Sequence, residues 1–179
     1  MADAVTSQTI IDTEKRVVMK FTNLSDGNGE SAVKKVDVSA LNSHPDGTAC
    51  SQVTIDQIWY DIGGMRLILN FEATTVAPAL ILGGSAAAGV SMGHMDFRSF
   101  GGIKNNASSP DGDLDFTTSG HTNLDHYTVI LEMRKQYLEG NAWRILLLVQ
   151  SLLTKHLLLM KLSKKLTSEL AYNLFRDIN

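Results

Sequence analysis

The sequence predicts an all-β fold, an antiparallel β-sandwich or jelly-roll-like domain, followed by a C-terminal α-helical extension. Three observations lead to this prediction. Short segments of alternating apolar and polar residues recur up to about Lys135, with clusters of Gly, Asn, Asp and Pro between them. The connections are too short to hold the crossover helices that parallel strands require. Every glycine and proline lies at or before Gly140, and helix-forming residues such as Leu and Lys are abundant beyond it.

The composition is that of an ordinary globular protein with a real core. The chain has 179 residues, of which 44% are hydrophobic and 20% are charged. A net charge of −3 and a pI near 5.9 give no basic surface of the kind that nucleic acids require, so no nucleic-acid partner is expected. The single cysteine, Cys50, excludes an intrachain disulfide, and we expect it to be an inert thiol in a polar loop.

The first part of the chain is typical of paired strands. A short strand is expected at Thr9–Asp12, and a longer one at Arg16–Leu24, where apolar and polar side chains alternate. The turn sequence Asp26–Gly29 follows, and Ala32–Leu41 alternates again. We therefore expect a hairpin over Arg16–Leu41.

A second hairpin is predicted over Val53–Ala73. Its arms are Val53–Ile62 and Met65–Ala73, joined by the pair Gly63-Gly64, which can adopt the positive φ of a tight turn. Apolar residues fall on both sides of the first arm, so both faces of that arm are expected to be partly covered.

The middle of the chain predicts an edge strand and a loop. Val76–Leu82 is apolar but contains Pro78, which removes a ladder donor and favours an edge position. Gly83–Gly93 is small and uncharged; it lacks a phosphate-binding pattern, and a plain loop is expected. A short strand is expected over Met95–Ile103.

The clearest alternation in the chain lies in Gly112–Lys135, which predicts a third hairpin. Its second arm alternates with period two, and Ser119–Asn123 supplies the Gly and Asn of a turn. One face of that arm is expected in the core: Tyr127, Val129, Leu131 and Met133.

The change of composition near Gly140 predicts a β-sandwich domain over residues 1–140 and a Leu/Lys-rich helical extension over residues 141–179. Leucines recur every seven residues, and the helix would span roughly 50 Å. Gln150, Lys155 and His156 interrupt the apolar density, so a membrane span is not expected. The repeated leucines are Leu152, Leu159 and Leu166.

No residue pattern predicts catalysis, and no G-x-S-x-G elbow or metal-binding spacing occurs. Asp111, Asp113 and Asp115 resemble the start of a calcium loop, but a solvated strand edge explains them better. His94, His121 and His126 are interpreted as turn and surface residues, and a metal-assisted hydrolase using His121, His126 and Asp125 stays a weak rival. We predict no enzyme activity, no metal and no cofactor.

Aromatic residues offer one further candidate site. Trp59, Tyr60 and Phe71 could together form a platform for a sugar ring, although aromatic residues in strands more often belong to a core.

Four segments carry a family resemblance. They are VVMKFTNLSDGNGESAVKKVDVSAL at Val17–Leu41, IDQIWYDIGGMRLILNFEAT at Ile55–Thr74, DFRSFGGIKNNA at Asp96–Ala107 and GDLDFTTSGHTNLDHYTVILEMRK at Gly112–Lys135. Together they resemble small β-rich virion structural proteins of tailed bacteriophages, notably marine and cyanobacterial ones. The resemblance covers residues 2–135 and brings no catalytic residues with it.

The resemblance implies a non-enzymatic protein located in the virion. The first hypothesis is a capsid decoration or cement protein that forms a homo-oligomer and docks on the major capsid protein. The alternative within this class is a neck or tail component. A carbohydrate-binding module for host attachment is a rival from another class.

The extension after Lys135 has no counterpart in this resemblance. It is either an assembly helix particular to this chain or the product of a shifted reading frame, and its regular apolar spacing favours the first. The residues expected at interfaces are Trp59, Tyr60, Leu152, Leu159 and Leu166.

Overall fold

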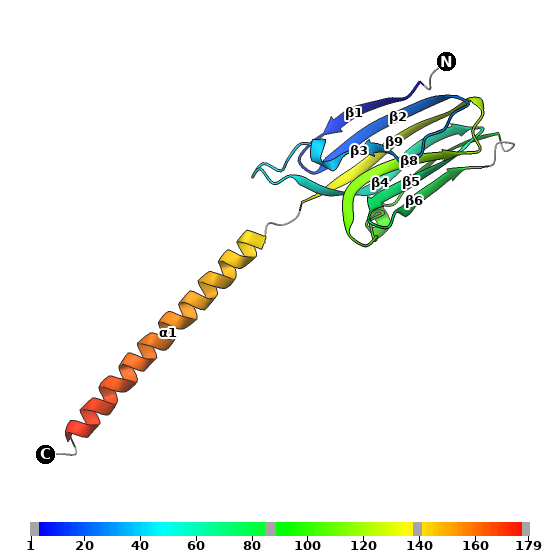
Figure 1. The fold of residues 1–179 in the computed structure, drawn as a ribbon. Coiled ribbons are helices and arrows are strands. Elements are labelled where there is room, and N and C mark those ends of the chain that lie inside the picture. Colours follow the sequence, from blue (N-terminus) through cyan, green and yellow to red (C-terminus); the bar gives the residue numbers. More distant parts are fainter. Residues whose placement is uncertain (1–3, 85–88, 138–140, 177–179) are drawn as a thin grey trace. The chain divides into compact units, whose positions relative to one another are not determined.

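The computed structural model describes the backbone of residues 4–84, 89–137 and 141–176. The chain divides into two compact units, residues 1–138 and residues 139–179 (Figure 1). Side chains of the second unit are described over residues 149–168.

The first unit is an antiparallel β-sandwich of two sheets, so the predicted fold class is confirmed. The five-stranded sheet has the order β1-β2-β9-β4-β7 and the four-stranded sheet the order β3-β8-β5-β6. The strands of the five-stranded sheet are β1 Thr6–Asp12, β2 Arg16–Asp26, β9 Asn123–Tyr137, β4 Cys50–Gly63 and β7 Val90–Asp96. Those of the other sheet are β3 Val33–Val36, β8 Pro110–Ser119, β5 Arg66–Ala73 and β6 Ala77–Gly83.

The core lies between the two sheets. The Phe116 ring on β8 meets Phe21 on β2 at a centroid distance of 5.1 Å and Tyr127 on β9 at 5.9 Å, both edge-to-face. Beside these rings Glu30 accepts a hydrogen bond of 2.6 Å from the Tyr127 hydroxyl and pairs with the buried Lys35 ammonium. The charges of Glu30 and Lys35 are therefore satisfied inside the domain.

The three predicted hairpins are wrong, although their strands exist. Each pair, β2 with β3, β4 with β5 and β8 with β9, divides between the two sheets. A Gly-rich turn allows a chain to cross between sheets as readily as to fold back beside itself. Crossing lets two consecutive strands bury their apolar faces against each other, as Phe116 and Tyr127 do.

Strand β4 contains a bulge that corrects a second expectation. Ile55 pairs with Met133 and Gln57 with Glu132, so Asp56 is the extra residue. The extra residue changes the phase of the alternation. Apolar residues on both sides of the bulge therefore face the core, so the assignment of these residues to two different faces is wrong. The expectation that both faces of this arm are partly covered is confirmed, because the outward-facing Thr54 and Gln57 are 0% and 6% exposed. The inward-facing residues, each at most 1% exposed, are Val53, Ile55, Ile58 and Ile62.

Two strand boundaries differ from the prediction. The strand predicted over Met95–Ile103 runs instead over Val90–Asp96, followed by a 3₁₀ turn at Arg98–Phe100. Part of the predicted loop is therefore strand, and residues 85–88 of that loop lie outside the described residues. Likewise β3 ends at Val36, because a 3₁₀ turn begins where Asp37 caps the backbone N–H of Ser39.

The edge position predicted from Pro78 is confirmed, because β6 is the last strand of its sheet. The early strand β1 is also present and begins at Thr6.

The second unit consists of helix α1, Asn141–Arg176. Its 36 residues correspond to about 54 Å at 1.5 Å per residue. In the part of the chain that the structure describes, no helix combines the length and apolarity needed to cross a membrane.

Candidate binding surface

The outward face of the five-stranded sheet carries two adjacent rows of exposed and partly exposed side chains. The register of the strands places His94, Trp59, Ile130 and Lys20 side by side across β7, β4, β9 and β2. The adjacent row across the same strands holds Met92, Asp61, Thr128 and Thr22.

Trp59 and His94 form a stacked pair at the β7 end of this face. Their ring centroids are 4.6 Å apart with planes inclined by 11°. That distance is close to the roughly 4.8 Å between neighbouring strands, so the two rings stand upright on the sheet. They therefore turn edges toward solvent, and one face of the indole is covered by the imidazole.

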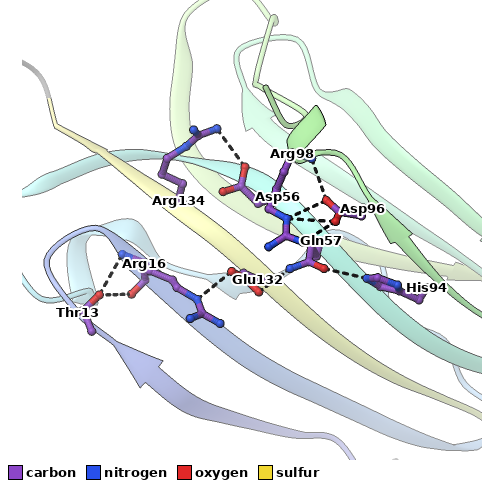
Figure 2. A network of polar contacts seen from close by, with 9 residues as sticks. All are labelled: Thr13, Arg16, Asp56, Gln57, His94, Asp96, Arg98, Glu132 and Arg134. Carbon is purple, nitrogen blue, oxygen red and sulfur yellow. Dashed lines mark hydrogen bonds and ion pairs between the residues drawn. The ribbon is translucent and has the colours of Figure 1, made fainter. Parts of the chain in front are cut away.

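A polar network fixes His94 from the other side (Figure 2). The Gln57 amide bridges two partners: its oxygen lies 2.9 Å from His94 Nε2, and its nitrogen donates to Glu132 at 2.9 Å. Glu132 in turn accepts from Arg16 Nε at 2.9 Å. The chain of contacts from β2 to β7 holds the imidazole in one orientation against Trp59.

Two ion pairs border the network (Figure 2). Side-chain hydrogen bonds from Arg98 hold the pKa of the Asp96 carboxyl at about 2. Burial raises the pKa of the Asp56 carboxyl, and the charge of Arg134, 3.0 Å away, opposes that rise. The bulge therefore places the partly desolvated carboxylate of Asp56 beside the exposed carboxylate of Asp96.

A shallow groove of about 420 Å³ runs along β4 and β7 beside the ring pair. Asp61 and Thr128 give this groove polar side chains beside the rings of Trp59 and His94. One carboxylate oxygen of Asp61, Oδ1, is itself buried and has no hydrogen-bond partner among the described residues. The residues lining the groove are Trp59, Tyr60, Asp61, Met92, Gly93, His94 and Thr128.

The three-ring platform that the sequence analysis considered does not form. Trp59 is 36% exposed on the outward face, whereas Phe71 is 2% exposed and belongs to the core. Tyr60 is partly buried against the core. Neighbouring residues in a strand point to opposite faces, which separates Tyr60 from Trp59.

The other sequence candidates are engaged within the fold. Asp113 accepts from Lys34 and from the backbone N–H of Val38, and Asp115 accepts from Asn70. Both carboxylates are buried, so the expectation of a solvated edge is wrong for them, and only Asp111 is exposed.

The histidines of the weak hydrolase hypothesis serve different turns. His121 lies over Gly29, His126 over Gly63, and Asp125 beside Gly64. Among the described residues, no three His, Cys, Asp or Glu side chains lie close enough to hold a metal ion together. Cys50 is the first residue of β4 and not part of a polar loop; burial raises the pKa of its thiol.

The sequence analysis missed Asp61, Gln57 and Glu132 as members of this surface. Only the cross-strand register, including the bulge, brings them beside Trp59 and His94. The predicted helix residues Leu152, Leu159 and Leu166 are exposed on α1.

The comparisons with known proteins give distant likenesses only. No protein-family model matches the chain. No curated protein matches it either.

Among solved structures, a cupin domain from Bordetella pertussis Tohama I is 11% identical and has a TM-score of 0.29, covering 74% of this chain and 93% of that one. Two variants of a family 29 carbohydrate-binding module are 10% and 8% identical, with TM-scores of 0.30 and 0.31. They cover 73% and 76% of this chain and 92% and 98% of their own. Likenesses at these identities and TM-scores say nothing about what this chain binds.

Proposed function

We propose that this chain is a non-enzymatic structural protein of a bacteriophage virion. In this proposal it oligomerises and docks in many copies on the capsid as a decoration or cement protein. Two lines support it: the resemblance of four segments to virion structural proteins, and the exposed leucines of α1. The leucines are the structural observation that carries it.

Helix α1 carries a row of apolar side chains that stay exposed to water as long as the helix has no packing partner. Leu152, Leu159 and Leu166 are 65%, 64% and 61% exposed and recur every seven residues. Burying one leucine contributes about 1.5–3 kcal/mol, so covering this row favours association strongly. The partner that matches a heptad row best is the same row on α1 of another copy.

The mechanism is adhesion by many modest interfaces. Helices from several copies would join the sandwiches into a closed, rotationally symmetric oligomer. Each oligomer would bury part of the sandwich surface against capsid subunits. Because it would bind only the assembled shell, its binding would stabilise that shell.

Deleting residues 141–179 tests the role of the helix. The expected result is a smaller native mass by sedimentation and loss of the protein from purified particles. A sharper pair is Leu159→Lys against Ser168→Lys, because both side chains are exposed on α1 and Ser168, nine residues after Leu159, lies on the opposite face from the leucine row. Equal masses for the two variants and unchanged incorporation after deletion would rule out the helical clamp.

Copy number separates the capsid from the neck or tail alternative. Quantitative mass spectrometry of particles should find on the order of hundreds of copies for a decoration protein, and about six or twelve for a component at one vertex.

Glycan binding at the Trp59 groove is the second candidate function. It is favoured by the exposed ring edge of Trp59, which lines the groove together with the polar side chains of Asp61 and Thr128. Trp59→Ala should abolish binding to host polysaccharide, whereas Phe100→Ala, which removes an exposed aromatic ring elsewhere, should leave it intact. An absence of binding by the native chain to every host polysaccharide would dispose of this candidate.

A further inference from the structure

Among the described strands of the sandwich, four lie at sheet edges, and three of these carry features that discourage pairing with another chain. Strand β3 has only four residues, and two of them are Lys34 and Lys35, the second in a bulge. Strand β6 has Pro78 and a bulge at Ala79. Strand β1 is interrupted by a bulge at Ile10. Lysine, proline, bulges and short length are the usual protections of an exposed edge.

Strand β7 has none of these protections. Its seven residues pair with β4 in unbroken register, from Gln57 opposite Asp96 to Gly63 opposite Val90. The strand contains no proline, lysine or bulge. Within the described residues β4 is its only strand partner, so its far edge presents a row of backbone N–H and C=O groups.

Apolar side chains accompany this open edge. Met92 is 71% exposed and Val90 is 60% exposed, and both point outward on the same face as Trp59. A regular edge with flanking apolar side chains is the arrangement that strand addition uses: the backbone supplies the hydrogen bonds, and the alternate side chains supply specificity.

We propose that β7 pairs antiparallel with β7 of a second copy, joining two five-stranded sheets across a two-fold axis. This contact lies in the sandwich, does not involve α1 and goes beyond the function proposed above. Gly93 is the midpoint of β7, so a register centred on Gly93 pairs all seven residues of both strands. Outward-facing residues then meet outward-facing residues, as the pleat requires.

The side chains that this register brings together argue for a second copy as the partner. Met92 of one strand lies opposite His94 of the other, and Val90 lies opposite Asp96. The two Asp96 carboxylates fall at opposite ends, about 20 Å apart, so like charges do not meet. A register centred on His94 would instead set imidazole against imidazole and Met92 against Asp96.

The contact is small. A seven-residue edge buries less than the roughly 1,200 Å² that stable protein interfaces bury, so pairing should depend on protein concentration. On a particle surface that already holds many copies, the effective concentration is high, and a weak contact can be occupied.

The first test uses matched lysine variants of the full chain. Met92→Lys puts a charge on the β7 edge, and Ile81→Lys puts one on the β6 edge at a side chain of similar exposure, 60%. Every chain in this test also carries Leu159→Lys, which removes the helix contact proposed above, so that only the sandwich can associate. Sedimentation over rising micromolar concentrations should then show an association step in Leu159→Lys and with Ile81→Lys that is absent with Met92→Lys. Unchanged thermal unfolding with Met92→Lys confirms the fold. An association step retained with Met92→Lys, or absent from Leu159→Lys alone, overturns the proposal.

The second test reads the register directly. Met92→Cys and His94→Cys chains, mixed under mild oxidation, should form a disulfide-linked heterodimer, because these positions are opposed across the axis. Either variant alone should stay unlinked, because identical positions lie two residues out of register across the axis, and the native Cys50 is buried. Linkage in a single variant, or none in the mixture, contradicts the register centred on Gly93.

The helix variant keeps this inference separate from the proposed function. Adding Leu159→Lys to both cysteine variants should leave the cross-link unchanged. If the cross-link does not form while the native chain still enters particles, the β7 contact is refuted and the proposed function is not.

Discussion

The sandwich and the helix place their leucines in opposite environments. Leu131, on the central strand β9, is 0% exposed, whereas Leu159 on α1 is 64% exposed. Both regions are rich in apolar residues, but only the sandwich has a second layer of its own to cover them. The difference teaches that the first unit contains the contacts for its own stability, and that the second unit offers no second layer within itself to cover its apolar row.

Phe116→Ala should have the largest effect on stability, and it tests whether the sandwich is stabilised by its own core. The ring is fully buried between Phe21 and Tyr127, so its removal should lower the free energy of unfolding by about 3–5 kcal/mol. Amide hydrogen exchange in β9 measures the loss. Phe100→Ala, at a ring 68% exposed, should cost far less, and equal losses for the two variants would contradict this account of the core.

Glu30→Ala should come next. It leaves the Lys35 ammonium buried without its carboxylate, a change that costs about 3–5 kcal/mol in buried ion pairs. We expect the lower end of that range, because the ammonium also lies 5.9 Å from the centre of the Phe116 ring. Glu14→Ala is the matched control, since its pair with Lys15 is exposed and should contribute almost nothing.

Leu159→Ala should leave the sandwich almost unaffected, which is the converse test. Because α1 belongs to the other unit, unfolding of the sandwich should stay within about 0.5 kcal/mol of native. Tryptophan fluorescence would mix signals from Trp59 and Trp143, so amide exchange in β9 is the better measurement. A loss approaching that of Phe116→Ala would show that the helix supports the sandwich.

Arg98→Ala should have the smallest effect on stability, and this effect should depend on pH. The pKa of Asp96 is lowered to about 2 from 3.8, so its stabilising contribution is present above pH 3.8 and is lost as the pH falls toward 2. In Arg98→Ala the pKa of Asp96 should return toward 3.8, as a carboxyl NMR titration would reveal. The pKa of Asp46, also lowered to about 2 by hydrogen bonds with Thr48, should not move.

The sequence predicted the strands better than their partners. Alternation identified β2, β5 and β9 because a period of two follows from the pleat alone. Partners depend on where the chain goes after a turn, and Gly63-Gly64 suits a return to the same sheet or a crossing to the other. The bulge at Asp56 was also missed, because the change of phase that it causes in the alternation can equally be interpreted as apolar residues on two faces of one regular strand.

The sequence analysis identified one residue of the candidate surface, Trp59, but not the residues that surround it. Trp59 was singled out from its type, and it does lie on an outward face. Its neighbours His94 and Glu132 come from strands 35 and 73 residues further along the chain, and only the register joins them (94 − 59 = 35; 132 − 59 = 73). Local sequence carries no record of such cross-strand neighbours.

The position of β9 has a mechanical consequence. This strand leads directly into the C-terminal unit and lies between β2 and β4, with a ladder on each side (Figure 1). At its end the buried Lys135 ammonium binds Asp12 and the Asn42 carbonyl, which fastens the strand to two other segments. Tension transmitted through the tail would load both ladders in shear at once, so the domain should withstand pulling from its C-terminal end far longer than peeling of β1 or β7.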